Sequence, residues 1–241
     1  MWGSKRSAIG WRTRLVGLIV LGLFAGGCAP DVAQRVDRIY DAEKSGQIDL
    51  EAPAEALEDE KTAVRVAATA VLGRSGDPRA AQTLARVAAD EDQGVRAAVA
   101  TALGQLGRPE GVLLLDRLAS DPVPLVRRRA LQSLASIGVP EGAPAAIRAL
   151  ADTSPELRRE AAKALAAMRS AGSVEALIEA LGDADVEVRA WAARALGEIG
   201  DPRAIPALRA MLASDSQYDR SAAATALEHF EAATADEAGP G

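Results

Sequence analysis

The sequence predicts an all-α fold, a solenoid of about six stacked helix pairs. A Val-Arg or Leu-Arg pair recurs every 31 residues without a slip in register, and a degraded sixth copy falls at Asp219-Arg220. A Leu follows each copy by eight residues, and an Asp precedes each intact copy by five. The intact copies begin at Val64, Val95, Val126, Leu157 and Val188. A fixed period of this length is typical of proteins that stack one helical unit many times.

The first 27 residues have the layout of a secretory signal peptide. Four Lys and Arg residues between positions 5 and 14 precede an apolar run from Leu15 to Phe24, and small residues follow. Ten apolar residues rise only about 15 Å as a helix, whereas the hydrocarbon core of a bilayer is about 30 Å thick. The segment therefore predicts export and cleavage rather than a permanent membrane span.

The single cysteine, Cys28, follows the small residues Ala25, Gly26 and Gly27. This segment resembles the lipobox of bacterial lipoproteins, although Leu is more usual at the position of Ala25. The resemblance implies that Cys28 is lipidated and becomes the mature N-terminus, so that several acyl chains hold the protein at a membrane. Ala29 implies the outer membrane, facing the periplasm, if the cell is Gram-negative. The alternative is an ordinary secreted protein with a free thiol, since one cysteine forms no internal disulfide.

The charge of the exported chain argues against nucleic acid as a partner. The formal net charge is −6, and removal of residues 1–27 deletes four positive charges and no acidic group, which leaves −10. A chain this acidic does not attract a phosphate backbone by bulk charge. We therefore expect no nucleic-acid binding.

The segment after the cysteine predicts an N-terminal capping helix. Asp31 and Gln34 make a capping box for a helix that reaches about Lys44. A second helix is predicted from Ile48 to Asp59 as part of an incomplete first repeat. Few residues separate Cys28 from the first helix, so we expect the solenoid to lie close to the membrane.

The repeated unit predicts two helices. In the copy that starts at Val188, apolar residues up to Ile199 fall at the spacing of one helical face, among the strong helix formers Ala, Leu, Arg and Glu. Gly200-Asp201-Pro202 predicts the end of this helix, because Gly adopts a left-handed cap and Pro cannot continue the helix. No segment alternates with period two, so no strands are expected. A second helix is predicted from about Arg203 to Ala213, with these residues inward: Ile205, Leu208, Met211 and Leu212.

The repeat pattern D-x-x-x-x-V-R-x-x-A-A-x-A-L-G-x-x-G-D-P-R resembles HEAT-like repeats of the phycobilisome-lyase (PBS-lyase) type over about residues 48–230. The resemblance implies a right-handed α-solenoid and says little about activity, because this repeat occurs in many unrelated proteins. It also implies a structural ladder of hydrogen-bonded Asp and Arg along the turns, and Asp further suits a helix N-cap. The ladder residues are Asp59, Arg65, Asp90, Arg96, Asp121, Arg127, Asp152, Arg158, Asp183 and Arg189.

After Phe230 the chain has no apolar residue larger than Ala, which predicts a disordered tail. The predicted segments are a signal peptide (1–27), a lipid attachment site with a capping helix (28–47), the repeat solenoid (48–230) and the tail (231–241).

The sequence offers no catalytic constellation. Its one His, His229, lies on the last predicted helix and is interpreted as a solvated residue, and no phosphate-binding G-x-x-x-x-G-K-[ST] motif occurs. Deoxyhypusine hydroxylases share the repeat but bind two irons through His-Glu pairs, which this chain lacks. Bilin lyases share it too, but no residue here matches their chemistry. We therefore predict no enzyme activity, no metal and no cofactor.

The outward positions of the Val-Arg helix predict a partner-binding surface, since this helix lines the concave side of HEAT-like stacks. These positions are nearly uncharged in the first two copies and form a basic patch in the next three. Trp191 is the only Trp after residue 27, at a position where other copies hold Ala, Arg or Glu. A Trp beside Arg is typical of interface anchors. The predicted partner-binding residues are Arg128, Arg129, Arg159, Lys163, Trp191 and Arg194.

Two interpretations of this face remain open. In one, Trp191 covers Ala-rich neighbours and the arginines only solubilise the helix. In the other, the face docks an acidic segment of another protein, and the chain is a non-catalytic interaction scaffold tethered in the bacterial cell envelope. A binding module for a small anionic envelope ligand is the alternative function, and an enzyme related to bilin lyases or deoxyhypusine hydroxylase is a third.

Overall fold

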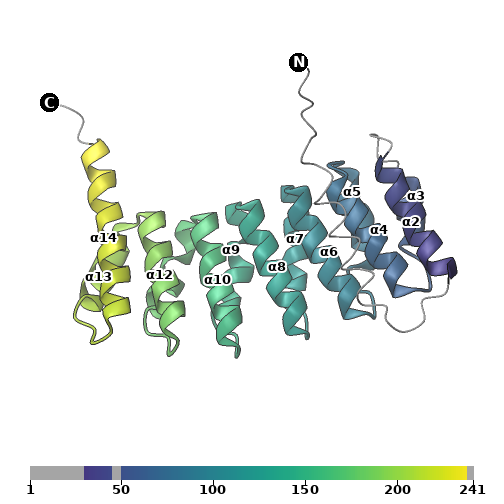
Figure 1. The fold of residues 1–241 in the computed structure, drawn as a ribbon. Coiled ribbons are helices and arrows are strands. Elements are labelled where there is room, and N and C mark those ends of the chain that lie inside the picture. The colour runs from purple at the N-terminus through teal and green to yellow at the C-terminus, as the bar shows by residue number, and fades with distance from the viewer. Residues whose placement is uncertain (1–29, 45–49, 238–241) are drawn as a thin grey trace, which may run out of the picture.

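The protein is an all-α solenoid, as the sequence predicts. The structure, a computed structural model, describes residues 30–44 and 50–237, and every regular element in these ranges is helical. Long helices form one layer of this described part and short helices form the other (Figure 1). The long helices are α2 (Pro30–Lys44), α4 (Thr62–Arg74), α6 (Gln93–Leu106), α8 (Pro124–Ile137), α10 (Pro155–Met168), α12 (Val186–Ile199) and α14 (Gln217–Glu237).

The short helices precede the long helices that they pair with, and most include a 3-10 turn. They are α3 (Glu51–Ala56), α5 (Arg79–Leu84) with η1 (Ala85–Val87), α7 (Val112–Leu118) after η2 (Pro109–Gly111), α9 (Ala143–Ala149) after η3 (Pro140–Gly142), α11 (Val174–Ala180) after η4 (Ala171–Ser173), and α13 (Ile205–Met211) after η5 (Pro202–Ala204). Six pairs from α3–α4 to α13–α14 therefore lie within the described residues, after the single helix α2.

Each long helix packs on its neighbours through the predicted apolar stripe. In α12, Val188, Ala192 and Leu196 are fully buried, and Ile199 is half-buried. The short helix α13 buries Leu208 and Met211, but Ile205 is only half-buried and Leu212 is exposed. The prediction that Leu212 faces inward is therefore wrong, because α13 ends at Met211 and Leu212 lies past the last packed turn.

Both ends of the solenoid differ from the sequence-based boundaries. The helix predicted from Ile48 to Asp59 is the shorter α3, and α14 continues to Glu237, past the position where the predicted tail begins. Cys28, the signal peptide (1–27) and residues 238–241 lie outside the described residues. Within residues 30–44 and 50–237, no helix combines the length and the apolar character needed to cross a bilayer.

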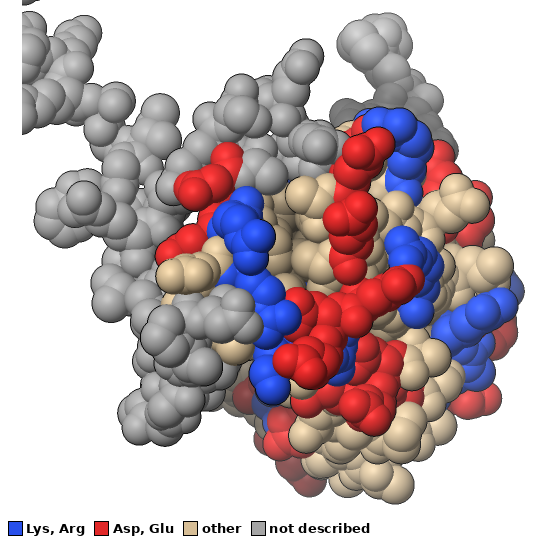
Figure 2. Space-filling model, turned by 90° about the vertical axis from the view of Figure 1, so that its right-hand side faces the viewer, with Lys and Arg blue, Asp and Glu red and all other residues tan. Residues whose placement is uncertain are grey.

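Helix α2 covers the N-terminal end of the stack. Val32 and Ile39 are buried against the solenoid, whereas Asp37, Arg38 and Asp41 are exposed. Figure 2 looks onto this end and shows basic and acidic side chains intermingled. A polar outer face suits a terminal unit, and within the described residues no further repeat packs on this side of α2.

Four of the long helices, α6, α8, α10 and α12, end at left-handed residues, and one of these residues is not glycine. Gly107, Gly138 and Gly200 follow α6, α8 and α12 with φ of 63°, 71° and 74°, whereas Arg169 follows α10 with φ of 47°. A residue with a side chain pays about 1–2 kcal/mol in this conformation, because its Cβ clashes with the following carbonyl oxygen, whereas glycine has no Cβ and avoids the clash.

Replacing Arg169 with Gly is expected to stabilise the protein by about 0.5–1 kcal/mol, because the backbone conformation stays and the side-chain strain is lost. Urea unfolding followed by circular dichroism measures this change. The reciprocal Gly107→Arg variant should lose stability by a similar amount. An unfolding midpoint that falls in Arg169→Gly contradicts the prediction.

A ladder of Arg and Asp side chains joins successive repeats. Arg96 donates from Nε and Nη2 to the two carboxylate oxygens of Asp121 in the next repeat, at 2.7 and 3.1 Å. Its Nη1 donates to the carbonyl oxygen of Asp90 in its own repeat, at 2.8 Å. Each such Arg therefore ties two repeats together. The same arrangement joins Arg65 to Asp90, Arg127 to Asp152 and Arg158 to Asp183.

The recurring Asp is not the helix N-cap, so that part of the prediction is wrong. Asp121 lies two residues before Val123, the N-cap of α8, and accepts a hydrogen bond at 2.8 Å from its N–H. The Asp thus orders the turn before the helix and keeps both carboxylate oxygens available to the Arg of the preceding repeat.

The ladder continues into the copy that looks degraded in the sequence. Ser214 occupies the register position of the recurring Asp, and Asp219 in the first turn of α14 supplies the carboxylate instead. Arg189 Nη2 lies 3.0 Å from Asp219 Oδ2, and the Ser214 hydroxyl donates to the same oxygen at 2.8 Å. At the other end, Arg35 of α2 donates to Asp59 at 2.8 Å.

The ladder predicts a loss of stability in acid. Burial is the largest single cause and raises the pKa of Asp90 and of Asp121. The hydrogen bonds from Arg65 and Arg96, a backbone N–H and the nearby positive charges together outweigh it, so both pKa values lie below the ordinary value. At Asp183 the hydrogen bond from Arg158 is the largest cause and also lowers the pKa. A lowered folded-state pKa stabilises the fold fully above the unfolded value of about 3.9, and this contribution is lost as pH falls through the folded value.

The free energy of unfolding is therefore expected to be flat from about pH 7 to pH 5 and to fall below about pH 4. Urea titrations at a series of pH values measure it. The Arg96→Ala variant is the control, because its slope below pH 4 should be shallower. Equal slopes for both proteins contradict a role of the ladder in the acid response.

Candidate functional site

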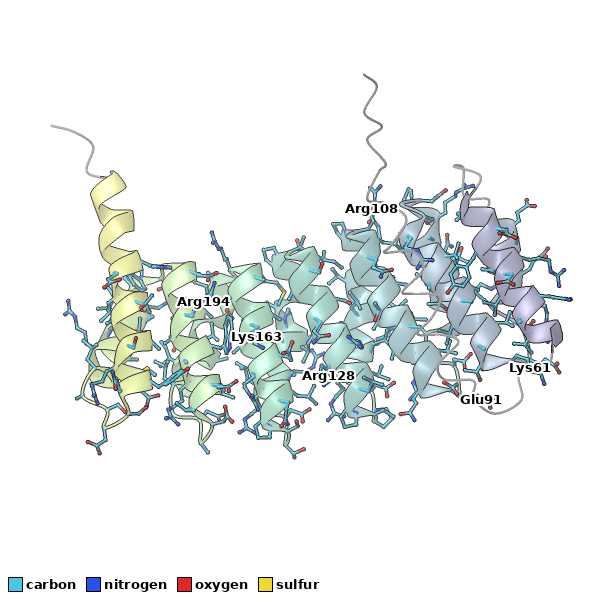
Figure 3. All side chains as sticks on the ribbon, viewed as in Figure 1. Lys61, Glu91, Arg108, Arg128, Lys163 and Arg194 are labelled. Atoms are coloured by element: carbon cyan, nitrogen blue, oxygen red, sulfur yellow. The ribbon has the colours of Figure 1, made fainter. Side chains whose placement is uncertain are left out.

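The predicted partner-binding residues lie on successive long helices. We define the long-helix face as the outward positions of these helices, which in α12 are Ala190, Trp191, Arg194 and Glu198. Figure 3 labels Arg128, Lys163 and Arg194, which come from α8, α10 and α12. The repeat period thus brings the predicted residues onto three adjacent helices.

The predicted basic patch is largely neutralised by carboxylates from the same helices. Arg159 Nη1 donates to Glu187 Oε2 at 2.8 Å, and this bond holds the pKa of the Arg159 guanidinium above its usual value. Lys163 Nζ donates to Glu160 Oε1 at 2.9 Å. The surface is therefore a network of paired charges rather than a uniformly basic patch.

The two arginines of α8 are less engaged. Arg129 donates to the side chain of Gln132 at 3.3 Å, and both Arg128 and Arg129 are exposed. Arg128 makes no hydrogen bond or ion pair with the residues that the structure describes. It lies two long helices away from Trp191, so it is not part of the cluster around that ring.

Two cations lie over the ring of Trp191. The Lys163 ammonium lies 5.3 Å from the centroid of its ring and the Arg194 guanidinium lies 4.9 Å from it. These distances allow cation–π attraction, which fixes the ring in place. Trp191 is half-buried rather than freely exposed as the sequence suggests, because Lys163 of α10 and Arg194 of its own helix pack against it.

An open groove runs beside Trp191 between α12 and α14. It has a volume of about 560 Å³. Small residues form part of its lining. Tyr218, Gln217 and Ser221 lie near the N-terminal end of α14, whereas Arg194 and His229 lie further toward the C-terminal ends of their helices. The lining residues are Ala190, Trp191, Arg194, Gln217, Tyr218, Ser221, Ala222, Thr225, Ala226 and His229.

Sequence reasoning missed the α14 side of this groove. Tyr218 is 69% exposed and His229 is exposed, and both were outside the predicted set. The 31-residue register contains the signal, because Ser221, Thr225 and His229 occupy the positions of Ala190, Arg194 and Glu198 one repeat later. Because the copy at Asp219-Arg220 departs from the repeat pattern, the long-helix face predicted from the sequence did not extend to α14.

A second, smaller groove of about 380 Å³ lies in the layer of short helices between α5 and α7. It includes Leu113, which is 67% exposed, with Glu110 and Arg117. In the described residues, no three His, Cys, Asp or Glu side chains gather as metal ligands.

Comparisons with known proteins agree with this architecture. A family model described as HEAT repeats matches residues 50–135, 85–154, 111–185 and 143–228. A search of curated protein sequences gives no significant match.

Solved structures with the same fold include natural and engineered repeat proteins. An engineered protein is 22% identical with a TM-score of 0.60, over 90% of this chain and 68% of that one. A computationally designed armadillo repeat protein for modular peptide recognition is 19% identical with a TM-score of 0.54, over 76% and 100% of the two chains. The complex of CpcE and CpcF of phycocyanin lyase from Nostoc sp. PCC7120 is 27% identical with a TM-score of 0.50, over 63% and 99%.

The overlapping family matches extend from residue 50 to residue 228, which is most of the chain, and they coincide with the helix pairs and the ladder described above. The protein belongs to the HEAT repeat family.

Proposed function

We propose that this protein is a non-catalytic interaction scaffold of the bacterial cell envelope, which binds an acidic segment of a partner protein on its long-helix face. The HEAT-repeat solenoid supports a binding role, because stacked repeats present an extended and preformed surface. A preformed surface loses little conformational entropy on binding, which favours affinity.

The observation that carries the proposal is the setting of Trp191. Its ring is held by Lys163 and Arg194 and lines an open groove, although no other repeat has an aromatic residue at this position. A Trp that only filled space between helices would be covered by its neighbours, whereas Trp191 borders an open groove. Rigid aromatic side chains next to Arg are the residue types that dominate binding energy at protein interfaces.

Capture from detergent-solubilised envelopes tests the binding role. A double variant, Trp191→Ala with Arg194→Glu, is compared with wild type and with Leu113→Ala, which changes an exposed residue on the opposite layer. We expect one protein to be recovered with wild type and with Leu113→Ala and to be at least tenfold depleted with the double variant. Equal recovery with all three proteins contradicts binding at this face.

We further propose that a lipid on Cys28 tethers the scaffold to the membrane, on the outer membrane and facing the periplasm if the cell is Gram-negative. The support is the lipobox-like segment that ends at Cys28. Several acyl chains hold a protein at a bilayer stably, since each buried methylene contributes about 0.8 kcal/mol.

Replacing Cys28 with Ala is expected to move the protein from the membrane pellet to the soluble fraction and to abolish incorporation of a labelled fatty acid. Cell fractionation and metabolic labelling of the full chain measure both effects. Ser4→Ala is the matched control, since it changes the N-terminal segment outside the lipobox. A Cys28→Ala protein that remains in the pellet and is still labelled contradicts lipidation at this residue.

A further inference from the structure

We infer that the groove between α12 and α14 recognises a peptide segment in which a large apolar side chain and a carboxylate lie two residues apart. This inference rests on the proposed function and names the chemistry of its partner. It follows from three features of the groove: the space that its small lining residues leave, the order of aromatic and basic groups along it, and the charge around Arg194.

The first feature is the space for a large side chain. Ala190, Ala222 and Ala226 line the groove with methyl groups only, so the neighbouring helices leave room between them. Trp191 lies on the α12 side and Tyr218 on the α14 side. An aromatic or long aliphatic side chain that enters here contacts two rings and loses apolar surface to water, which is the contact geometry of interface anchors.

The second feature is the order of groups along the groove. The repeat register gives the order of these residues along the parallel helices α12 and α14. Tyr218 lies one helical turn before Trp191, Arg194 lies one turn after it, and His229 lies one turn beyond Arg194. The groove therefore has an aromatic end and an end that carries the basic and imidazole groups. A ligand that fits both ends has an apolar group and an anionic group side by side.

The third feature is the charge around Arg194. Its Nε donates to Glu198 Oε1 at 2.8 Å, and Arg169 Nη2 lies 3.9 Å from the other oxygen of the same carboxylate. Two arginines thus share one carboxylate, and Lys163 has its own partner in Glu160. The Trp191 cluster of these five charged groups keeps one net positive charge.

The Arg194 side chain is 59% exposed, and its terminal nitrogens Nη1 and Nη2 make no hydrogen bond to the described residues. A guanidinium with free terminal donors binds a carboxylate through two parallel hydrogen bonds, which is the strongest neutralising contact available to it. This is the reason for an acidic group in the ligand rather than a second apolar group.

The spacing follows from helix and strand geometry. Trp191 and Arg194 are three residues apart on α12, which is about 4.5 Å along the helix axis. Side chains on the same side of an extended peptide repeat every second residue, about 6.6 Å apart. The length of the Arg side chain covers the difference, so we expect the apolar and acidic residues of the ligand at positions i and i+2.

Selection from a displayed library of random 12-residue peptides tests the inference. The full-length protein in detergent is the target, in parallel with Trp191→Ala, Arg194→Gln, Tyr218→Ala and the control Arg117→Gln, an exposed Arg of α7 in the opposite layer. Circular dichroism first establishes that all five proteins have equal helix content. Tyr218→Ala guards against a folding artefact, because an exposed side chain contributes little to the core.

We expect the enriched peptides to pair an aromatic or large aliphatic residue with Asp or Glu two residues away. Synthetic copies of one such peptide should bind at least tenfold more weakly to Trp191→Ala, Arg194→Gln and Tyr218→Ala, and within threefold of wild type to Arg117→Gln. Changing the acidic residue of the peptide to its amide should weaken binding to wild type tenfold but have no further effect on Arg194→Gln. If the amide change no longer weakens binding once Arg194 is replaced, the peptide carboxylate binds Arg194.

Three results overturn the inference. The first is enrichment of peptides without the apolar–acidic pair. The second is an equal loss of affinity of the amide peptide for wild type and Arg194→Gln, and the third is that no peptide is enriched. Failure of the proposed function is a separate result. If the enriched peptides bind all three groove variants within threefold of wild type, the protein still binds peptide segments and only the assignment of the groove is wrong. The envelope capture described above decides the binding role independently.

Discussion

Replacing Arg96 with Ala is expected to lower the free energy of unfolding by about 3 kcal/mol, because it removes one partner of a buried ion pair and leaves the other charge in place. The Asp121 side chain is only 7% exposed and accepts two hydrogen bonds from this guanidinium. The variant also leaves the carbonyl oxygens of Asp90 and Glu91 without their donor.

The loss should affect the junction between α6 and α8 most strongly. In a solenoid each repeat contacts only its neighbours, so a weakened junction divides the array into two parts. The urea transition measured by circular dichroism is therefore expected to shift to lower urea and to broaden. Hydrogen exchange should show faster exchange in the helices on both sides of the junction than in wild type.

Arg148→Ala is the matched control for this prediction. Arg148 also joins an Asp of a neighbouring repeat, Asp116 at 2.8 Å, but the two side chains are 52% and 36% exposed. Exposed ion pairs contribute about 0–1 kcal/mol, because water and salt screen them. If Arg148→Ala and Arg96→Ala lower the free energy of unfolding equally, burial is not the reason that the ladder stabilises the protein.

Replacing Gly197 with Ala is expected to destabilise the protein by about 2 kcal/mol, within the range for overpacking a tight interface. A Cβ built at Gly197 lies 2.8 Å from the Cα of Ala226 and 3.0 Å from its carbonyl oxygen. Both atoms belong to the backbone of α14, which cannot move aside as a flexible side chain can. The two helices must therefore separate.

The effect should be confined to the last repeat. Helix α14 packs on α12 and α13, so hydrogen exchange is expected to accelerate in α14 while α4 and α6 stay unchanged. Because α12 and α14 form the walls of the groove, peptide binding should weaken as well. Gly182→Ala is the control: the nearest atom to its Cβ is 3.4 Å away, so it should change stability by less than about 0.5 kcal/mol. A stable Gly197→Ala protein with native exchange in α14 contradicts the close approach of the two helices.

Several features of the site could be predicted from the sequence, and others could not. The period placed Lys163, Trp191 and Arg194 on outward positions of neighbouring helices, because a strict repeat fixes which positions face the core. It did not show that Arg159 is bound by Glu187, a residue 28 positions later on the next long helix. Charges on different helices meet only if the helices stack at a particular spacing and stagger, and local periodicity does not contain that information.

The same reason explains the groove and the final rung of the ladder. Asp219 replaces an Asp that the register predicts at position 214, and this replacement works because the first turn of α14 brings its carboxylate to Arg189. The groove exists because Gly197 brings α14 close to α12 while Ala residues keep the space beside Trp191 open. Both depend on distances between chain segments that are far apart in the sequence.

The sequence alone determined the fold class, the helix pairs and the buried stripe, because each of these follows from a local pattern repeated with a constant period. The resemblance to HEAT-like repeats implied the ladder residues. Only the tertiary structure decided which charges are paired, that Trp191 faces a groove and that Asp219 supplies the last carboxylate of the ladder. The physical reason is that ion pairs and grooves depend on separations of a few ångströms between stacked helices, and the volume of the side chains at each interface sets those separations.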